Sequence, residues 1–326
     1  MEEKEIKNLI ENLNKKARQS SRKCLFKGCH EPAIESHLLQ RRGIINQIAE
    51  NNHVWELGQD NFNTDVFFFK NIGVKEAFSF FGFCSTHDNS LFKEIENSSI
   101  DYTVYRTQLL FSYRAIMNEM RKKEILIDYY DRILRSFTLG LYVSKSYFEY
   151  IKESKQGLQD GIKDEFYFEN YFLSNINDPT KRDFKFTTFE LPRTEICSSA
   201  VFTYETTAEI NHMLMFKSYK EEKPLTEIYF NFLPTIDKSI IIMGCLNERV
   251  DLCWNYIESF KSKSPNESLK KISDLLLCQV ENWLCSNTLY QTKIKAKEKE
   301  IIKITHESII HPNERRELDF NMFSNE

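Results

Sequence analysis

Residues 83–92 read FCSTHDNSLF, with a cysteine and a histidine three positions apart and an acid and an amide directly after the histidine. Earlier in the chain, residues 24–42 read CLFKGCHEPAIESHLLQRR, with two cysteines five positions apart. Structural zinc sites take thiolate and imidazole ligands in such local pairs. The two stretches therefore predict one Zn²⁺ site that joins them across the intervening residues. The predicted ligands are Cys24, Cys29, Cys84 and His87.

Two further histidines compete for a place in this site. His30 directly follows Cys29, and His37 lies in the same stretch, so either is an alternative to His87 as a ligand. His37 has two other interpretations, as a general base and as a hydrogen-bonded structural residue, because a neutral imidazole serves in both roles. A closed zinc shell couples metal binding to folding. We therefore expect metal removal to unfold residues 20–100 well before the C-terminal half.

The order of these residues resembles the HNH, or ββα-metal, treble-clef family over roughly residues 20–100. The resemblance lies in the cysteine pair, the Ser-His before Leu-Leu-Gln, and the later Phe-Cys-x2-His-Asp. It implies a zinc-bound finger in which His37 is the general base and Asp88 takes the position of a metal-binding histidine. Asp88 and Asn89 offer the oxygen ligands that Mg²⁺ or Mn²⁺ prefers. The chain also resembles bacterial proteins that carry this finger in mobile-element or phage-defence loci.

The sequence departs from the family pattern at three positions. Ser36 stands where the family has a histidine or an aspartate, Gln40 replaces a proline, and Phe92 replaces the last histidine. A hydrolytic nuclease needs both a base for water and a metal on the scissile phosphate, so these departures weaken the case for a catalytic metal. Arg41 and Arg42 are candidate phosphate-binding residues, because a guanidinium matches phosphate oxygens. Such a pair is also typical of a solvent-exposed helix face.

Composition argues against several classes of protein. The 326 residues are 41% hydrophobic and 28% charged, so the chain can bury a core. It has only 9 glycines and neither GxGxxG nor GxxxxGK[ST], which argues against a nucleotide cofactor. No apolar run approaches the roughly 18 residues of a membrane span. The net charge of −4 disfavours a general nucleic-acid coating but allows a local basic patch.

Cysteine usage bears on the compartment. The chain has 8 cysteines, and its charged N-terminus lacks the apolar core of a secretory signal. Thiols without a secretory signal are typical of a reducing compartment. We therefore expect a cytoplasmic protein in which four of the Cys and His residues bind metal and the other cysteines are buried.

The hydrophobic pattern predicts an α+β fold in three regions. Residues 1–100 hold an N-terminal helix and the zinc-bound, treble-clef-like finger, 101–160 are long helices, and 161–326 form a mixed antiparallel sheet packed by helices. A polar stretch with two glycines at 155–162 favours a boundary there. The expected helices are 3–19, 38–50, a helix starting at 87, two helices within 101–155 that break at 128–130, 250–261, 266–290 and 293–308. The expected strands lie within 51–79 and at 184–191, 199–206, 226–234 and 238–246.

Two functions fit these residues. The missing final histidine, the net charge and a C-terminal region without a motif favour a zinc-stabilised recognition or scaffold protein in a bacterial defence system, with a nucleic acid or a protein as partner. The alternative is an HNH-type endonuclease that hydrolyses DNA or RNA. Convergence of His37, Asp88 and Asn89 on one accessible point would favour the enzyme. A His37 turned into the zinc shell or the core would favour the scaffold.

Overall fold

The computed structural model of the chain describes residues 3–59, 67–97, 99–216, 224–262, 264–280, 282–310 and 314–324. Its secondary structure is mixed, and its paired strands are antiparallel, as the sequence predicts. The N-terminal elements are α1 (Glu3–Gln19), β1 (Ser36–His37), a 3-10 helix (Ile45–Gln47), β2 (His53–Gln59), β3 (Phe67–Gly73), β4 (Ser79–Phe80) and α2 (Ser85–Phe92).

Three helices and the remaining strands follow. The helices are α3 (Tyr105–Leu134), α4 (Phe137–Tyr142) and α5 (Lys145–Asn177). The C-terminal elements are β5 (Phe184–Pro192), β6 (Ile196–Thr203), α6 (Thr207–Phe216), β7 (Glu227–Pro234), β8 (Lys238–Leu246), α7 (Val250–Glu258), α8 (Pro265–Cys278), β9 (Trp283–Cys285), α9 (Asn287–Leu289) and α10 (Lys295–Ile310).

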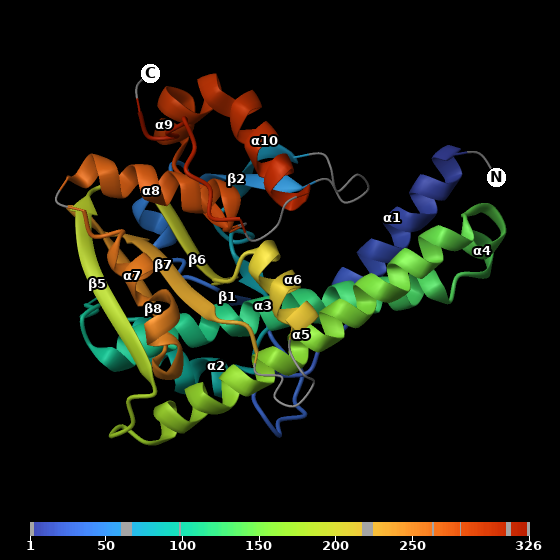
Figure 1. Cartoon of the computed structure of the whole chain (residues 1–326), viewed down its shortest axis with the longest axis horizontal. Coiled ribbons are helices and arrows are strands. Elements are labelled where there is room, and N and C mark those ends of the chain that lie inside the picture. Colours follow the sequence, from blue (N-terminus) through green and yellow to red (C-terminus); the bar gives the residue numbers. More distant parts are fainter. Residues whose placement is uncertain are drawn as a thin grey trace.

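The large sheet has seven strands in the order β3-β2-β9-β6-β7-β8-β5. Side chains on β8 alternate between two cores: Ile240 and Ile242 face the core with α3 and α5, whereas Ile241 and Met243 face the core with α7, α8 and α10. Because both faces are covered, the strand is apolar at nearly every position rather than at alternate ones. Figure 1 shows these helices on the two sides of the sheet.

A helical arm extends from the sheet. α1 and α4 lie together at one end of the molecule, away from the strands (Figure 1). A small core of its own holds the arm, in which buried Ile133, Leu139 and Ile151 pack with apolar side chains of α1. The amphipathic pattern predicted for residues 3–19 therefore buries its apolar side against α3, as expected for a surface helix.

The structure corrects several expectations. α3 runs through 128–130 without a break, and 38–50 holds only the short 3-10 helix. Residues 283–285, expected to be helical, are the strand β9, because this segment fills the gap between β2 and β6 and pairs with both.

Strands from the expected regions 1–100 and 161–326 belong to the same sheet. The predicted boundary at 155–162 falls inside α5, and β2 and β3 from region 1–100 pair into the sheet of the C-terminal strands. The three-region division stays a prediction. Residues 60–66, within the stretch expected to form strands, lie outside the described residues.

Candidate metal centre and adjoining cavity

A tight loop presents the first ligand pair. The backbone N–H of Cys24 donates to the carbonyl of Glu31 at 2.8 Å, and that of Cys29 donates to Phe26 at 2.9 Å. Gly28 within this loop has a φ of +80°, a conformation that residues with a Cβ rarely adopt. The turn therefore folds back on itself and brings the two thiols to one side.

Two short strands connect this loop to the second pair. β1 pairs antiparallel with β4, and α2 begins shortly after β4 with Cys84 as its N-cap. The loop is held to this unit by backbone hydrogen bonds, from Leu25 N–H to the Gly82 carbonyl at 2.9 Å and from Ile34 N–H to the Phe83 carbonyl at 2.8 Å. These contacts place a loop and a helix start side by side, although 54 residues separate the two ligand pairs in the chain.

The four predicted ligands form one cluster whose ligand atoms all lie within 4.8 Å of one another. Cys24 Sγ lies 3.5 Å and Cys84 Sγ 3.2 Å from His87 Nδ1, and Cys29 Sγ lies 3.9 Å from Cys84 Sγ. A tetrahedral Zn²⁺ requires separations of about 3.8 Å between sulfurs and about 3.5 Å between sulfur and nitrogen. The cluster thus has the composition and spacing of a site that could hold a metal such as zinc.

The surroundings of the thiols also suit a cation. The backbone N–H of His87, in the first turn of α2, lowers the pKa of the Cys84 thiol. Burial raises the pKa of Cys24 to about 11, so its thiol needs a positive partner to ionise. The His87 ring stacks on Phe26 with centroids 4.0 Å apart, which fixes the direction of Nδ1.

A cavity of about 730 Å³ adjoins this centre. The side chains predicted from the sequence for catalysis or phosphate binding line it together: His37, Asp88, Asn89, Arg41 and Arg42. The other residues that line it are Glu35, Ser36, Gln40, Lys93, Glu96 and Arg114. Residues of β1, of α2 and of α3 therefore meet at one hollow.

His37 faces this cavity rather than the metal cluster. Its Nε2 lies 3.1 Å from the carbonyl oxygen of Lys75, which can only accept, so Nε2 carries the proton and Nδ1 is left as an acceptor. Burial lowers the pKa of His37, which keeps the ring neutral near pH 7. Neither His37 nor His30 belongs to the cluster, whose fourth member is His87.

Asp88 and Asn89 lie at the middle of α2. Asp88 Oδ1 is buried without a hydrogen-bond partner, and the nearest cation is Arg114 Nη2 at 3.8 Å. Asn89 donates from Nδ2 to the Ser85 carbonyl at 2.9 Å, which leaves its side-chain oxygen for another partner. Among the described residues, the Cys₃His group is the only cluster of three or more His, Cys, Asp or Glu ligand atoms at metal spacing.

Arg114, Glu96 and Lys93 also line this cavity, although no sequence motif predicted them there. Arg114 lies on the buried face of α3 between Tyr113 and Ile116, where a charge is unusual. That position is the signal that was available, because a fully buried arginine needs a specific reason.

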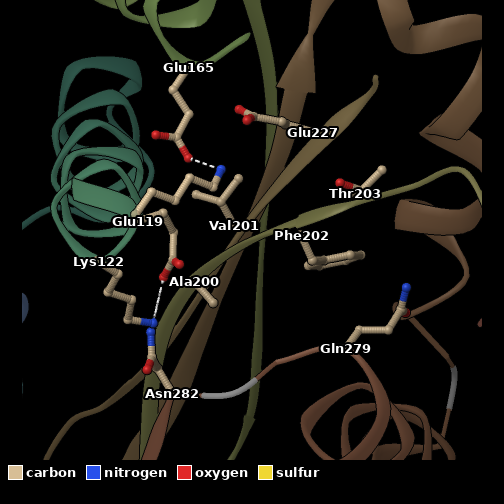
Figure 2. Close-up of a pocket in the computed structure, with 11 residues that line it drawn as sticks. Glu119, Lys122, Glu165, Ala200, Val201, Phe202, Thr203, Glu227, Gln279 and Asn282 are labelled. Carbon is tan, nitrogen blue, oxygen red and sulfur yellow. Dashed lines mark hydrogen bonds and ion pairs between the residues drawn. The ribbon is translucent and has the colours of Figure 1, made fainter. Parts of the chain in front are cut away.

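A second cavity, of about 200 Å³, lies between the helices and the sheet. Figure 2 shows the Glu165 and Glu227 carboxylates at one end and Glu119, Lys122 and Asn282 at the other. Burial raises the pKa of Glu165 to about 7 and that of Glu227 to about 8. Lys123 pairs with Glu165 and Lys122 pairs with Glu119, and the raised pKa of Glu227 favours its protonated form.

In comparisons with known proteins, no family model, no curated protein and no solved structure matches this chain. Among the described residues, none of the helices is both long enough and apolar enough to cross a membrane.

Proposed function

We propose that the chain is a zinc-stabilised endonuclease of the HNH type, and that the cavity beside the metal cluster is where a phosphodiester of DNA or RNA is hydrolysed. The observation that carries the proposal is the meeting of His37, Asp88, Asn89 and two arginines at one cavity. The order of β1, β4 and α2 around the cluster agrees with the ββα arrangement that the sequence resembles.

His37 is suited to the general base. Its Nδ1 is the acceptor of a neutral imidazole whose orientation the Lys75 carbonyl holds, so it can take a proton from an attacking water. The cluster of Cys24, Cys29, Cys84 and His87 has a structural role, because a closed shell of four protein ligands leaves no position for substrate.

Asp88 and Asn89 would hold a catalytic Mg²⁺ or Mn²⁺ through oxygen, with water and substrate supplying the other ligands. Such an ion neutralises charge that develops on the scissile phosphate. Arg41 and Arg42 supply positive charge at the same cavity, which favours entry of a phosphate backbone despite the net charge of −4.

The test is cleavage of plasmid DNA and of RNA by the purified protein in Mg²⁺ or Mn²⁺. We expect His37→Ala to reduce cleavage at least 100-fold, because general-base catalysis contributes about 10²–10⁴, with zinc content unchanged. His53→Ala is the matched control, since His53 is exposed on β2 and does not line the cavity. Equal cleavage by the two variants would remove His37 from the mechanism.

A recognition or scaffold protein, within a bacterial defence complex, is the second candidate. The observation that favours it is the 3.8 Å approach of Arg114 to Asp88, which balances a charge that a metal would otherwise neutralise. On this hypothesis the protein binds nucleic acid or a protein partner without cleaving it. Metal-independent binding that His37→Ala leaves unchanged, with no cleavage by the wild-type protein, would decide for the scaffold.

A further inference from the structure

Arg114 is the most deeply buried charged residue of the cavity, with 1% of its surface exposed. It comes from α3, a helix outside the ligand loop and outside α2. Removing a guanidinium from water costs several kcal/mol unless its donors are paired. The partners of Arg114 therefore indicate what the buried charge is for.

Those partners use only part of the guanidinium. Nη1 donates to Glu96 Oε1 at 2.5 Å, whereas Nη2 is 3.8 Å from Asp88 Oδ1 and Nε has no hydrogen-bond partner. The group lies over the ring of Phe92, 4.1 Å from its centroid, which fixes the guanidinium plane. A guanidinium has five N–H donors, and Arg114 commits one nitrogen of three to a hydrogen bond.

Arg121, a second buried arginine on α3, provides a comparison for the hydrogen bonding of Arg114. Arg121 is 2% exposed, and its Nη1 donates to the Glu124 carboxylate while its Nη2 donates to the Lys23 carbonyl at 2.5 Å. Nε lacks a hydrogen-bond partner in both arginines, so the difference lies at Nη2, which has an acceptor in Arg121 and none within hydrogen-bond distance in Arg114. Ser36 Oγ, another buried polar atom of the cavity, also lacks a partner.

We propose that Arg114 is a phosphate-binding residue of the cavity, whose Nη2 donates to a non-bridging oxygen of the substrate phosphate. Nη2 carries two N–H donors and shares the positive charge that favours a phosphate oxygen, whereas Nε is buried behind it. Glu96 and Phe92 hold the guanidinium in place, and no hydrogen bond to Asp88 has to break first. The proposal deepens the proposed function and rests on it for the identity of the substrate.

The test compares the wild-type protein with Arg114→Lys, Glu96→Gln and the control Arg106→Lys. Arg106 is on the same helix but bonds to Glu94 and the Ile176 carbonyl, away from the cavity. Binding of inorganic phosphate is measured by phosphorus NMR titration, binding of a DNA duplex is measured in Ca²⁺ at several salt concentrations, and cleavage is measured in Mg²⁺. Zinc content and thermal unfolding report whether each variant is folded.

We expect Arg114→Lys to weaken phosphate and duplex binding about 10-fold, because an ammonium keeps the charge but lacks the fixed donor geometry of a guanidinium. Glu96→Gln should tighten phosphate binding several-fold, since it removes a competing negative charge, and Arg106→Lys should change neither. If Arg114→Lys does not fold, the phosphate affinity of Glu96→Gln is the measurement that tests the proposal. The proposal fails if folded Arg114→Lys binds phosphate within two-fold of the wild type, or if Glu96→Gln has no effect.

The outcomes separate this proposal from the proposed function. Phosphate binding that depends on Arg114, in a protein that neither binds nor cleaves nucleic acid, would retain the anion site and reject the nuclease. Equal cleavage by the wild type and Arg114→Lys would retain the nuclease and reject the role of Arg114. Absence of both phosphate and nucleic-acid binding in the wild type would reject both.

Discussion

At the scale of single residues, buried charges on this protein fall into two kinds. Arg114 and Arg121 cannot lose their charge, so each must find acceptors. Glu165 and Glu227 can lose their charge by taking up a proton. Burial raises the pKa of both carboxyls, which favours the protonated form. The cavity beside the metal cluster therefore contains one deeply buried permanent charge, Arg114, whereas the cavity in Figure 2 contains two carboxyls whose pKa values burial raises.

Glu227 makes stability depend on pH. Burial and then the nearby Glu165 raise its pKa from 4.5 to about 8, so its contribution is fully present below pH 4.5 and is lost as pH rises through 8. We expect the free energy of unfolding to fall by on the order of 2 kcal/mol between pH 5 and 8.5, because each pKa unit corresponds to about 1.4 kcal/mol before the discount for partial exposure.

Glu227→Gln tests this dependence. The amide stays neutral at every pH and still accepts from the Tyr229 hydroxyl, so the pH slope in urea unfolding should become smaller. Glu190→Gln is the control, because Glu190 is on the surface of β5, paired with Lys238, and should leave the slope unchanged. An unchanged slope in Glu227→Gln would show that this carboxylate is already ionised in the folded protein at neutral pH.

At the scale of elements, sequence patterns predicted the helices and strands that depend on residues close together in the chain. The ligand pairs, α1, α2 and the strands β7 and β8 follow from the spacing of residues close together in the chain. β9 does not, because its three residues become a strand only by pairing with β2 and β6. Cys285 therefore packs from a strand, although the apolar pattern around it indicates a helix.

In the candidate site, too, residues that belong to a local pattern could be predicted, whereas a residue placed by long-range packing could not. The four metal ligands could be predicted because each pair is local and the ion has strict preferences. Arg114 could not, because its place in the cavity depends on where α3 lies relative to β1 and α2, which no short motif encodes. Its ion partner Glu96 lies eighteen positions away in the chain, beyond the reach of a helical repeat.

Two glycines in different elements should respond in opposite ways to substitution by alanine. At Gly244 on β8, an added Cβ would lie 2.2 Å from the Phe186 ring and 2.8 Å from the Lys185 carbonyl, whereas Gly157 on α5 has no atom within 4 Å of this position. We expect Gly244→Ala to destabilise by about 1–3 kcal/mol and Gly157→Ala to stabilise by about 0.5–1 kcal/mol.

Urea unfolding of the two variants measures whether each substitution raises or lowers the free energy of unfolding. The same outcome bears on the region around 155–162, because a stabilising alanine requires that α5 is helical there. A destabilising Gly157→Ala would indicate that the chain is not a continuous helix through that stretch.

At the scale of the whole molecule, the metal cluster and the sheet share one core. Phe83 and Phe92 beside the cluster belong to the same buried group as Tyr113 on α3 and Tyr229 on β7. β2 and β3 lie between the two ligand pairs in the chain, but β2 pairs with β9 and β3 pairs with β2, so both belong to the sheet of the C-terminal strands. The sequence predicts that residues 20–100 unfold together without metal, but this sheet pairing gives β2 and β3 a support that does not depend on the metal.

Metal removal should therefore destabilise only part of residues 20–100. We expect a zinc chelator to lower hydrogen-exchange protection in 24–34 and 83–92, where the four ligands lie, while β2 and β3 keep the protection that they have with metal bound. Cys84→Ser should reproduce this pattern and lose zinc, whereas Cys278→Ser, a buried position on α8, should retain about one zinc per chain. Loss of protection in β2 and β3 together with the ligand loop would mean that the cluster and this edge of the sheet fold as one cooperative unit.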